Sequence, residues 1–234
     1  MSQDRSDTVV RTTARSRAKA DRRATLLAEA ARLFARRGFD GVSMEELGAA
    51  AGISGPAVYR HFASKQAVLA ALLVGASARL RDGGDAVVER ATDDAAALRA
   101  LVRFHTGFAL AEPDVIRVQD RDLDALTEAD RHTVRGLQRG YVEAWVAVLA
   151  RLDPDVPVAE LRLRTQAMFG LLNSTPHSTR GQGVRGVPRT RVAELLEQMA
   201  LAALGQGGQG AGCSCGNAQD PSSTSGGGRS RRTR

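Results

Sequence analysis

Residues 38–65 read GFDGVSMEELGAAAGISGPAVYRHFASK, and this stretch decides the fold of the chain. Ser43 is followed three residues later by Glu46, which is the spacing of a capping box that begins a helix. An Ala-Gly pair stops that helix, and Ser54 begins another with proline in its first turn, where the missing N–H costs little. Two short helices joined by a tight glycine turn predict a helix-turn-helix, whose second helix reads DNA.

Longer helices are expected on both sides of this motif. One is predicted to begin near Asp21, and Gly38 supplies its left-handed C-cap. Its apolar face follows the helical period and consists of Leu26, Ala30, Leu33 and Phe34. Ser64 is predicted to cap a helix after the motif, and that helix carries its own apolar face. The motif therefore lies between two helices that can cover it.

The whole pattern predicts an all-α chain, because no stretch shows the sustained alternation of a half-buried strand. We expect a flexible basic arm at 1–19, a helix-turn-helix domain at 20–80, a helical body at 81–204 and a disordered Gly/Ser-rich tail at 205–234. The longest apolar run has ten residues, 67–76, and a membrane span needs about 20. With no secretory signal at the N-terminus, these features predict a cytoplasmic, nucleoid-associated protein with no membrane partner.

The net charge of +7 is concentrated at the two ends of the chain. Residues 1–23 hold seven basic and three acidic residues, and residues 205–234 hold four arginines and one aspartate. Between these two ends, basic and acidic residues are equal in number. Basic ends on a neutral body favour a polyanionic partner, of which nucleic acid is the usual one, although basic tails can also serve solubility alone.

Residues 21–75 resemble the DNA-binding domain of tetracycline-repressor-like (TetR) regulators. The likeness is carried by GFDGVSM at 38–44, AGIS at 51–54 and VYRHFASK at 58–65. It implies an N-terminal three-helix DNA-binding domain and a C-terminal helical domain for ligand binding and dimerisation. It also implies a homodimer that binds a palindromic operator in double-stranded DNA and responds to a small-molecule effector. The resemblance implies no cofactor.

The predicted DNA contacts lie in and around the reading helix. By resemblance, Ser43, Tyr59, His61 and Lys65 contact the DNA backbone, and Tyr59 and His61 project on opposite sides of the helix. The tip of the helix lacks a long side chain that could bind guanine, so base contacts there should be apolar or made by close backbone approach. Arg60 would read guanine or face solvent. The predicted set is Ser43, Ser54, Gly55, Pro56, Ala57, Tyr59, Arg60, His61 and Lys65. Phe62, and in part Tyr59, could instead serve packing.

The body is predicted to hold five helices. Thr92 caps the first, Pro113 opens a short one, Thr127 caps the longest, and the last two occupy about 157–174 and 189–204. In the resembled family, the last two helices pair with their copies in the dimer. Asn173, Thr175 and His177 are interpreted as cap and turn residues between them, and the alternative is that they form the floor of a pocket.

A mostly apolar effector pocket is predicted inside the body. Its wall is expected from Phe104, His105, Phe108, Tyr141 and Trp145, with Arg117 or Arg121 near its mouth. His105 is either a polar anchor for the ligand or a hydrogen-bonded core histidine. An apolar effector with an anionic end, such as an acyl-coenzyme A, is expected from the resemblance. A regulator of drug efflux that responds to aromatic or cationic compounds is the alternative.

Other classes of function find less support in the sequence. No set of nucleophile, base and orienting residue is recognisable, nor is a phosphate loop, so we expect no enzyme. The acidic residues at 120–130 lack matching histidines, and we expect no metal site there. Cys213 and Cys215 lie in the glycine-rich tail, and their closeness is more simply explained by chance than by metal binding or oxidation. A constitutive DNA-binding protein without a ligand remains a third possibility.

Overall fold

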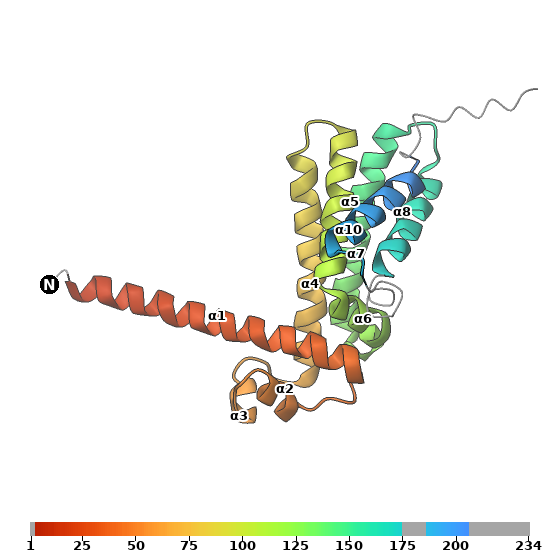
Figure 1. Cartoon of the computed structure of the whole chain (residues 1–234). Coiled ribbons are helices and arrows are strands. Elements are labelled where there is room, and N and C mark those ends of the chain that lie inside the picture. Colours follow the sequence, from red (N-terminus) through yellow and green to blue (C-terminus); the bar gives the residue numbers. More distant parts are fainter. Residues whose placement is uncertain (1–2, 175–185, 206–234) are drawn as a thin grey trace, which may run out of the picture.

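The computed structural model describes residues 3–174 and 186–205, with side chains from Ser16 onward, and every regular element in these ranges is a helix. The helices are α1 (Gln3–Arg37), α2 (Met44–Ala50), α3 (Gly55–Val58), α4 (Lys65–Glu89), α5 (Asp94–Ala111), α6 (Pro113–Asp122), the short 3-10 helix η1 (Leu123–Ala125), α7 (Glu128–Leu152), α8 (Val158–Asn173) and α10 (Arg189–Ala203). Helices α2 and α3 lie beneath α1, and α4 rises from them into the helical body (Figure 1). The all-α prediction is confirmed.

The starts of α2, α4 and α7 follow the predicted caps. The Ser43 hydroxyl accepts from the Glu46 amide at 3.2 Å, and the Glu46 carboxylate accepts from the Ser43 amide at 2.8 Å. Ser64 and Thr127 cap α4 and α7 in the same way. Helix α5 differs from the prediction, because it is capped by Asp93 and not by Thr92. A carboxylate accepts the amide hydrogen bond more strongly than a hydroxyl does, because the acceptor is charged.

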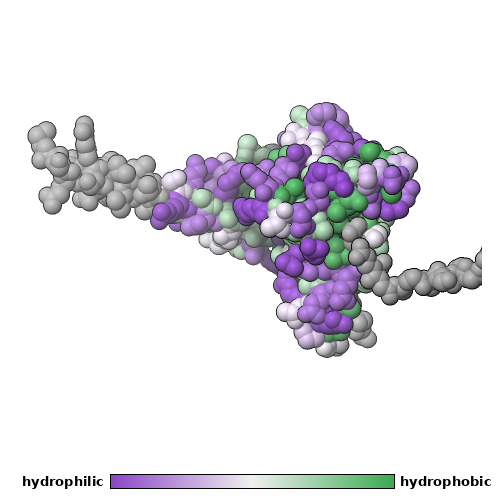
Figure 2. Space-filling model, turned by 90° about the horizontal axis from the view of Figure 1, so that it is seen from above, coloured by the Kyte–Doolittle hydropathy of each residue, from purple (hydrophilic) through white to green (hydrophobic). Residues whose placement is uncertain are grey.

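Helix α1 begins at Gln3, so the predicted start near Asp21 was wrong and residues 3–19 are not an irregular arm. The segment from Gln3 to Arg37 contains neither glycine nor proline. Once a helix has formed, each added residue contributes a backbone hydrogen bond without a second nucleation cost, so nothing stops this helix toward its N-terminus. The helix projects from the body (Figure 1), and the part of it that is coloured in Figure 2, next to the body, is largely hydrophilic.

Helix α3 is shorter than predicted and ends at Val58 instead of near Phe62. Beyond it the chain tightens, because the amides of Arg60 and His61 donate to carbonyls three residues back, at 3.3 and 2.8 Å. Such 3-10 bonds are common where a helix ends. Tyr59, Arg60 and His61 are therefore presented by a tight turn and not by a regular helix.

Two hydrophobic cores are stacked along α4. The lower core joins α1, α2 and α3 to the first half of α4, but it also includes Val115 and Val118 of α6 and Val134 of α7. The upper core joins α5, α7, α8 and α10 to the second half of α4. The predicted boundary at residue 80 thus falls inside a continuous helix, and α6 is packed into the core of the DNA-binding domain. No helix among the described residues is long and apolar enough to cross a bilayer.

Candidate nucleic-acid interface and buried aromatic core

One hollow beside α3 brings together three of the predicted backbone contacts. Ser43, Tyr59 and Lys65 line an open hollow of about 470 Å³. Tyr59 is 52% exposed, and the Lys65 ammonium lies 4.4 Å from the centre of the Phe39 ring, which holds the charge in place. Glu46 also lines the hollow, but Arg37 pairs with it at 2.7 Å and lowers its pKa. Asp40 and Glu45 line it as well, so the phenol, the hydroxyl and the ammonium lie in a hollow that also holds three carboxylates.

A second hollow lies on the other side of α3. It has a volume of about 450 Å³, and its lining includes Ala57, Arg60 and His61 together with Lys19 and Arg22 of α1. Tyr59 and His61 therefore lie in different hollows, as their spacing predicted. Ser54, Gly55 and Pro56 form the exposed or half-buried first turn of α3, and the Ser54 hydroxyl makes no capping bond. The predicted DNA-binding residues thus line one of the two hollows or lie in the accessible first turn of α3.

The contribution of α1 to this surface was missed by the sequence prediction. The Arg23 guanidinium donates to the His61 carbonyl at 3.3 Å and lies 4.2 Å from the centre of the Phe62 ring. Phe62 is itself buried, which agrees with the prediction that it packs the domain together. Lys19 and Arg22 are three residues apart, a spacing that puts both on one helix face and that could have been noticed had the helix been extended past Asp21.

His105 stands at the centre of a ring cluster in the upper core. Its ring centre lies 6.2 Å from that of Phe108, 5.8 Å from that of Tyr141 and 6.3 Å from that of Trp145. Phe169 of α8 lies closer, at 4.7 Å. Four of the five predicted wall residues therefore come together. Phe169 was missed, although it lies four residues after the buried Thr165 and so belongs to the inner side of α8.

Phe104, the fifth predicted wall residue, lies elsewhere. Its ring covers Gly83 of α4, where an added side-chain carbon would overlap it. The neighbouring Gly84 is covered by the Tyr141 ring in the same manner. The absence of side chains at Gly83 and Gly84 lets α5 and α7 approach α4 closely, so Phe104 seals the α4–α5 contact and stays outside the cluster.

The polar contacts of His105 fix its protonation. Its Nε2 lies 3.1 Å from the Asn173 Oδ1, which can only accept, so Nε2 carries the hydrogen and donates. Its Nδ1 lies 3.3 Å from the Tyr141 hydroxyl and accepts from it. Burial lowers the pKa of His105 to about 4, so the ring is neutral at pH 7. Asn173 thus contacts the core histidine besides ending α8, which corrects its interpretation as a cap; Thr175 and His177 lie outside the described residues.

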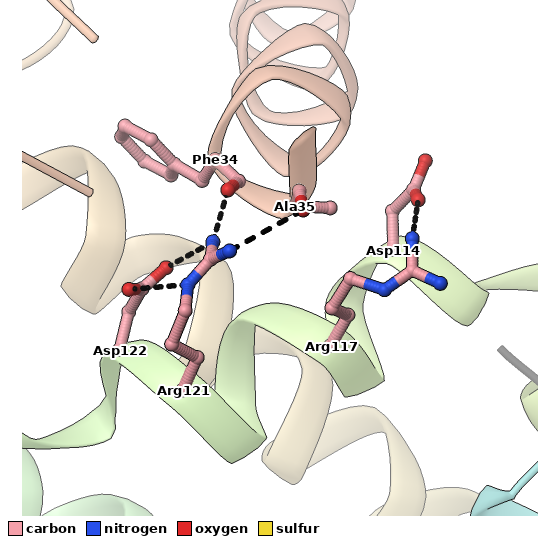
Figure 3. Close-up of polar contacts among 6 residues, drawn as sticks. All are labelled: Phe34, Ala35, Asp114, Arg117, Arg121 and Asp122. Atoms are coloured by element: carbon pink, nitrogen blue, oxygen red, sulfur yellow. Dashed lines mark hydrogen bonds and ion pairs between the residues drawn. The ribbon is translucent and has the colours of Figure 1, made fainter. Parts of the chain in front are cut away.

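Arg121 was predicted near the mouth of the pocket, but it joins α6 to the end of α1 instead (Figure 3). Its guanidinium donates to the Phe34 carbonyl and, at 3.5 Å, to the Ala35 carbonyl. The same guanidinium pairs with the buried Asp122 carboxylate at 3.0 Å. Arg117 instead faces Asp114 within α6, at 3.9 Å. The last carbonyls of a helix have no partner within it, so Arg121 supplies one from the helical body.

Comparison with known proteins agrees with this architecture. The family model "Bacterial regulatory proteins, tetR family" matches residues 26–72, and "Tetracyclin repressor-like, C-terminal domain" matches residues 91–204. The HTH-type transcriptional repressor KstR2 of Rhodococcus jostii (strain RHA1) is 30% identical over 158 residues, which are 64% of this chain and 78% of that relative.

Solved structures share the fold. A TetR-family transcriptional regulator from Bordetella parapertussis 12822 has a TM-score of 0.67 and 26% identity, and the match covers 76% of this chain and 93% of that one. AibR in complex with isovaleryl coenzyme A and operator DNA has a TM-score of 0.63 and 18% identity, covering 76% and 97%. Taken with the helix-turn-helix and its helical body, these matches show that the chain belongs to the TetR family of DNA-binding transcriptional regulators.

Proposed function

We propose that the chain is a homodimeric repressor that binds a palindromic operator in double-stranded DNA and is released by a small effector. The surface formed by α3 and its flanking hollows would read one half-site, with Ala57 toward the bases and Tyr59, His61 and Lys65 toward phosphates. So short a reading element covers few base pairs, so two copies related by a two-fold axis would be needed for tight binding. The relative KstR2 is named as a repressor.

The position of α6 is the observation that carries this proposal. Phe108 contacts His105 in the ring cluster and lies in the last turn of α5, directly before α6. At its other end, α6 holds the C-terminal end of α1 through Arg121. A ligand that separates the rings would therefore displace α5 and α6, and with them the helix-turn-helix. Such a ligand favours release only if it binds the displaced conformer more tightly.

The effector is proposed to be an acyl-coenzyme A thioester. Once a ligand separates the rings they would form apolar walls around it, and neutral His105 and Asn173 could hydrogen-bond a thioester carbonyl without requiring a charge. The similarly folded AibR was crystallised with isovaleryl coenzyme A, and we extend that chemical class to this chain as a proposal.

A DNA-binding titration tests both parts. The purified protein should protect a palindrome in the DNA upstream of its own gene, and acyl-coenzyme A species of increasing chain length should release it. Free coenzyme A is the matched control, because it carries the anionic end without the acyl chain. Release by a cationic aromatic compound and by no acyl-coenzyme A would replace the proposed effector with that of a drug-efflux regulator. Protection that no compound reverses would favour a constitutive DNA-binding protein.

A further inference from the structure

Lysine is rare in this chain, and both of its lysines lie beside α3. Only two of the 33 basic residues are lysines, Lys19 and Lys65. Lys19 lines the hollow between α1 and α3, whereas Lys65 lines the hollow on the other side of α3. A lysine amine can be acylated and then loses its charge, whereas the guanidinium of arginine stays charged. The two side chains at which acylation can remove a positive charge therefore both lie next to the reading helix.

Lys19 is surrounded by other cations. Arg22 follows it by three residues and so lies on the same face of α1, and Arg60 enters the hollow from the turn after α3. Burial lowers the pKa of His61, and the charges of these three cations lower it further, so all of them act on one point. None of the described residues that line the hollow is acidic. An anion that enters this space of about 450 Å³ is therefore attracted without opposition from a carboxylate.

Lys65 has the opposite surroundings. Its side chain is half-buried, and its ammonium lies 4.4 Å from the centre of the Phe39 ring. Three carboxylates line its hollow, those of Asp40, Glu45 and Glu46. The other lysine is exposed. An anionic reagent is thus drawn to one lysine and repelled from the other, although both lie beside the same short helix.

We propose that Lys19 is a covalent modification site, acylated by a coenzyme A thioester whose phosphates are held by Arg22 and Arg60. The lysine ammonium first releases one proton to solvent. The free amine then attacks the carbonyl carbon of the thioester, and the carbon–sulfur bond breaks. The proton that leaves the nitrogen ends on the thiol of coenzyme A. The product is an uncharged amide, and no oxidant or further reactant enters the balance.

Acylation of Lys19 gives the protein a second response to acyl-coenzyme A. The effector proposed above binds reversibly in the helical body and leaves on dilution, whereas an amide persists. Removing a positive charge next to α3 weakens binding to DNA, because each phosphate that a cation neutralises contributes about 0.9 to the slope of log affinity against log salt. This consequence rests on the proposed DNA-binding function, whereas the acylation itself does not.

Peptide mapping by mass spectrometry tests the site. The full chain is incubated with acetyl-coenzyme A or with S-acetyl-N-acetylcysteamine, which carries the same thioester but no phosphate. The ratio of acetylation at Lys19 to that at Lys65 should be about tenfold higher with acetyl-coenzyme A, because two exposed ion pairs together contribute on the order of tenfold. Arg22→Gln should lower this preference, and Arg36→Gln, which removes an exposed charge from the other end of α1, should leave it unchanged. Equal ratios with both reagents would show that exposure alone directs the reaction and would overturn the proposed site.

Operator titration measures the consequence after gel filtration has removed free acetyl-coenzyme A. Treated wild-type protein should bind more weakly than untreated protein, with a salt slope lower by about 2 for a dimer. Lys19→Arg keeps a positive charge but offers no amine, so its treated and untreated samples should agree. Acetylated Lys19 with unchanged operator affinity would overturn the regulatory role, as would equal weakening of treated Lys19→Arg. Untreated wild-type protein that binds no operator would instead remove the proposed function and leave the mapping result in force.

Discussion

The imidazole of His105 is surrounded by aromatic rings and hydrogen-bonds to two uncharged side chains, Tyr141 and Asn173. Protonating it would place a charge in the upper core and would force its Nδ1 to donate to a hydroxyl that now donates to it. Its pKa is therefore lowered from 6.5 to about 4. The same neutrality that suits an uncharged ligand group makes folding sensitive to acid.

The pH dependence of stability follows from this shift. Above pH 6.5 the ring is neutral in both the folded and unfolded states, so its contribution is constant. As the pH falls from 6.5 toward 4, the unfolded state takes up the proton first, and the free energy of unfolding should fall by about 2 kcal/mol by pH 5. Urea unfolding at pH 7 and pH 5 measures this. His105→Gln removes the titration and should lose less stability over that interval; equal losses would contradict the assignment.

At the scale of elements, α4 depends on Gly83 and Gly84 for its packing. The Tyr141 ring lies where a side-chain carbon of residue 84 would be. Gly84→Ala should therefore overpack the α4–α7 contact and destabilise the fold by about 1–3 kcal/mol. Gly107→Ala on α5 is the control, because an added carbon there meets nothing within 4 Å and removes a flexible residue from a helix. In chemical unfolding, Gly84→Ala should lower the free energy of unfolding and Gly107→Ala should raise it. A stable Gly84→Ala protein would show that α4 and α7 can move apart freely.

Helix α6 is the element that both domains share. Arg121→Gln removes the guanidinium that joins Asp122 to the carbonyls of Phe34 and Ala35. We expect effector binding to persist while the effector-induced loss of operator affinity shrinks, because movement of α6 no longer pulls on α1. Coupling between sites is typically 5–150-fold, so a change is measurable by operator titration with and without effector. Arg117→Gln on the same helix should retain the wild-type coupling. Equal coupling in all three proteins would exclude Arg121 as the link.

At the scale of the whole molecule, α8 and α10 expose apolar side chains that a monomer would leave in water. Leu163 is 65% exposed and Met199 is 52% exposed, and Val158 and Leu195 belong to the same two helices. In the proposed dimer these helices would pair with their copies and remove the apolar surface from solvent.

Replacing Leu163 and Met199 together by arginine should therefore give a monomer in light scattering and weaken binding to the full palindrome strongly, because each monomer reaches one half-site. His132→Arg, an exposed change on α7, should remain dimeric. A wild-type protein that is monomeric at micromolar concentration without DNA would contradict the dimer.

The sequence alone predicted the elements of this fold where local rules act. Helix ends are marked by contacts within three or four residues. The predicted N-caps are found at Ser43 with Glu46, at Ser64 and at Thr127, and Gly38 has the positive φ of the predicted C-cap. The spacing of Tyr59 and His61 likewise placed them on different sides of α3. Local rules failed at Gln3, because no local signal ends α1 earlier and helix propagation continues until one does.

Only the tertiary structure decided which helices meet and through which residues. His105 and Asn173 are 68 residues apart, and Arg121 and Phe34 are 87 residues apart. Helical periodicity states that a residue faces inward but not which partner it finds, because crossing angles and the register between helices depend on how all side chains pack at once. For the same reason Phe104 met Gly83 instead of the ring cluster, and Lys19 and Arg22 came to share a hollow with His61.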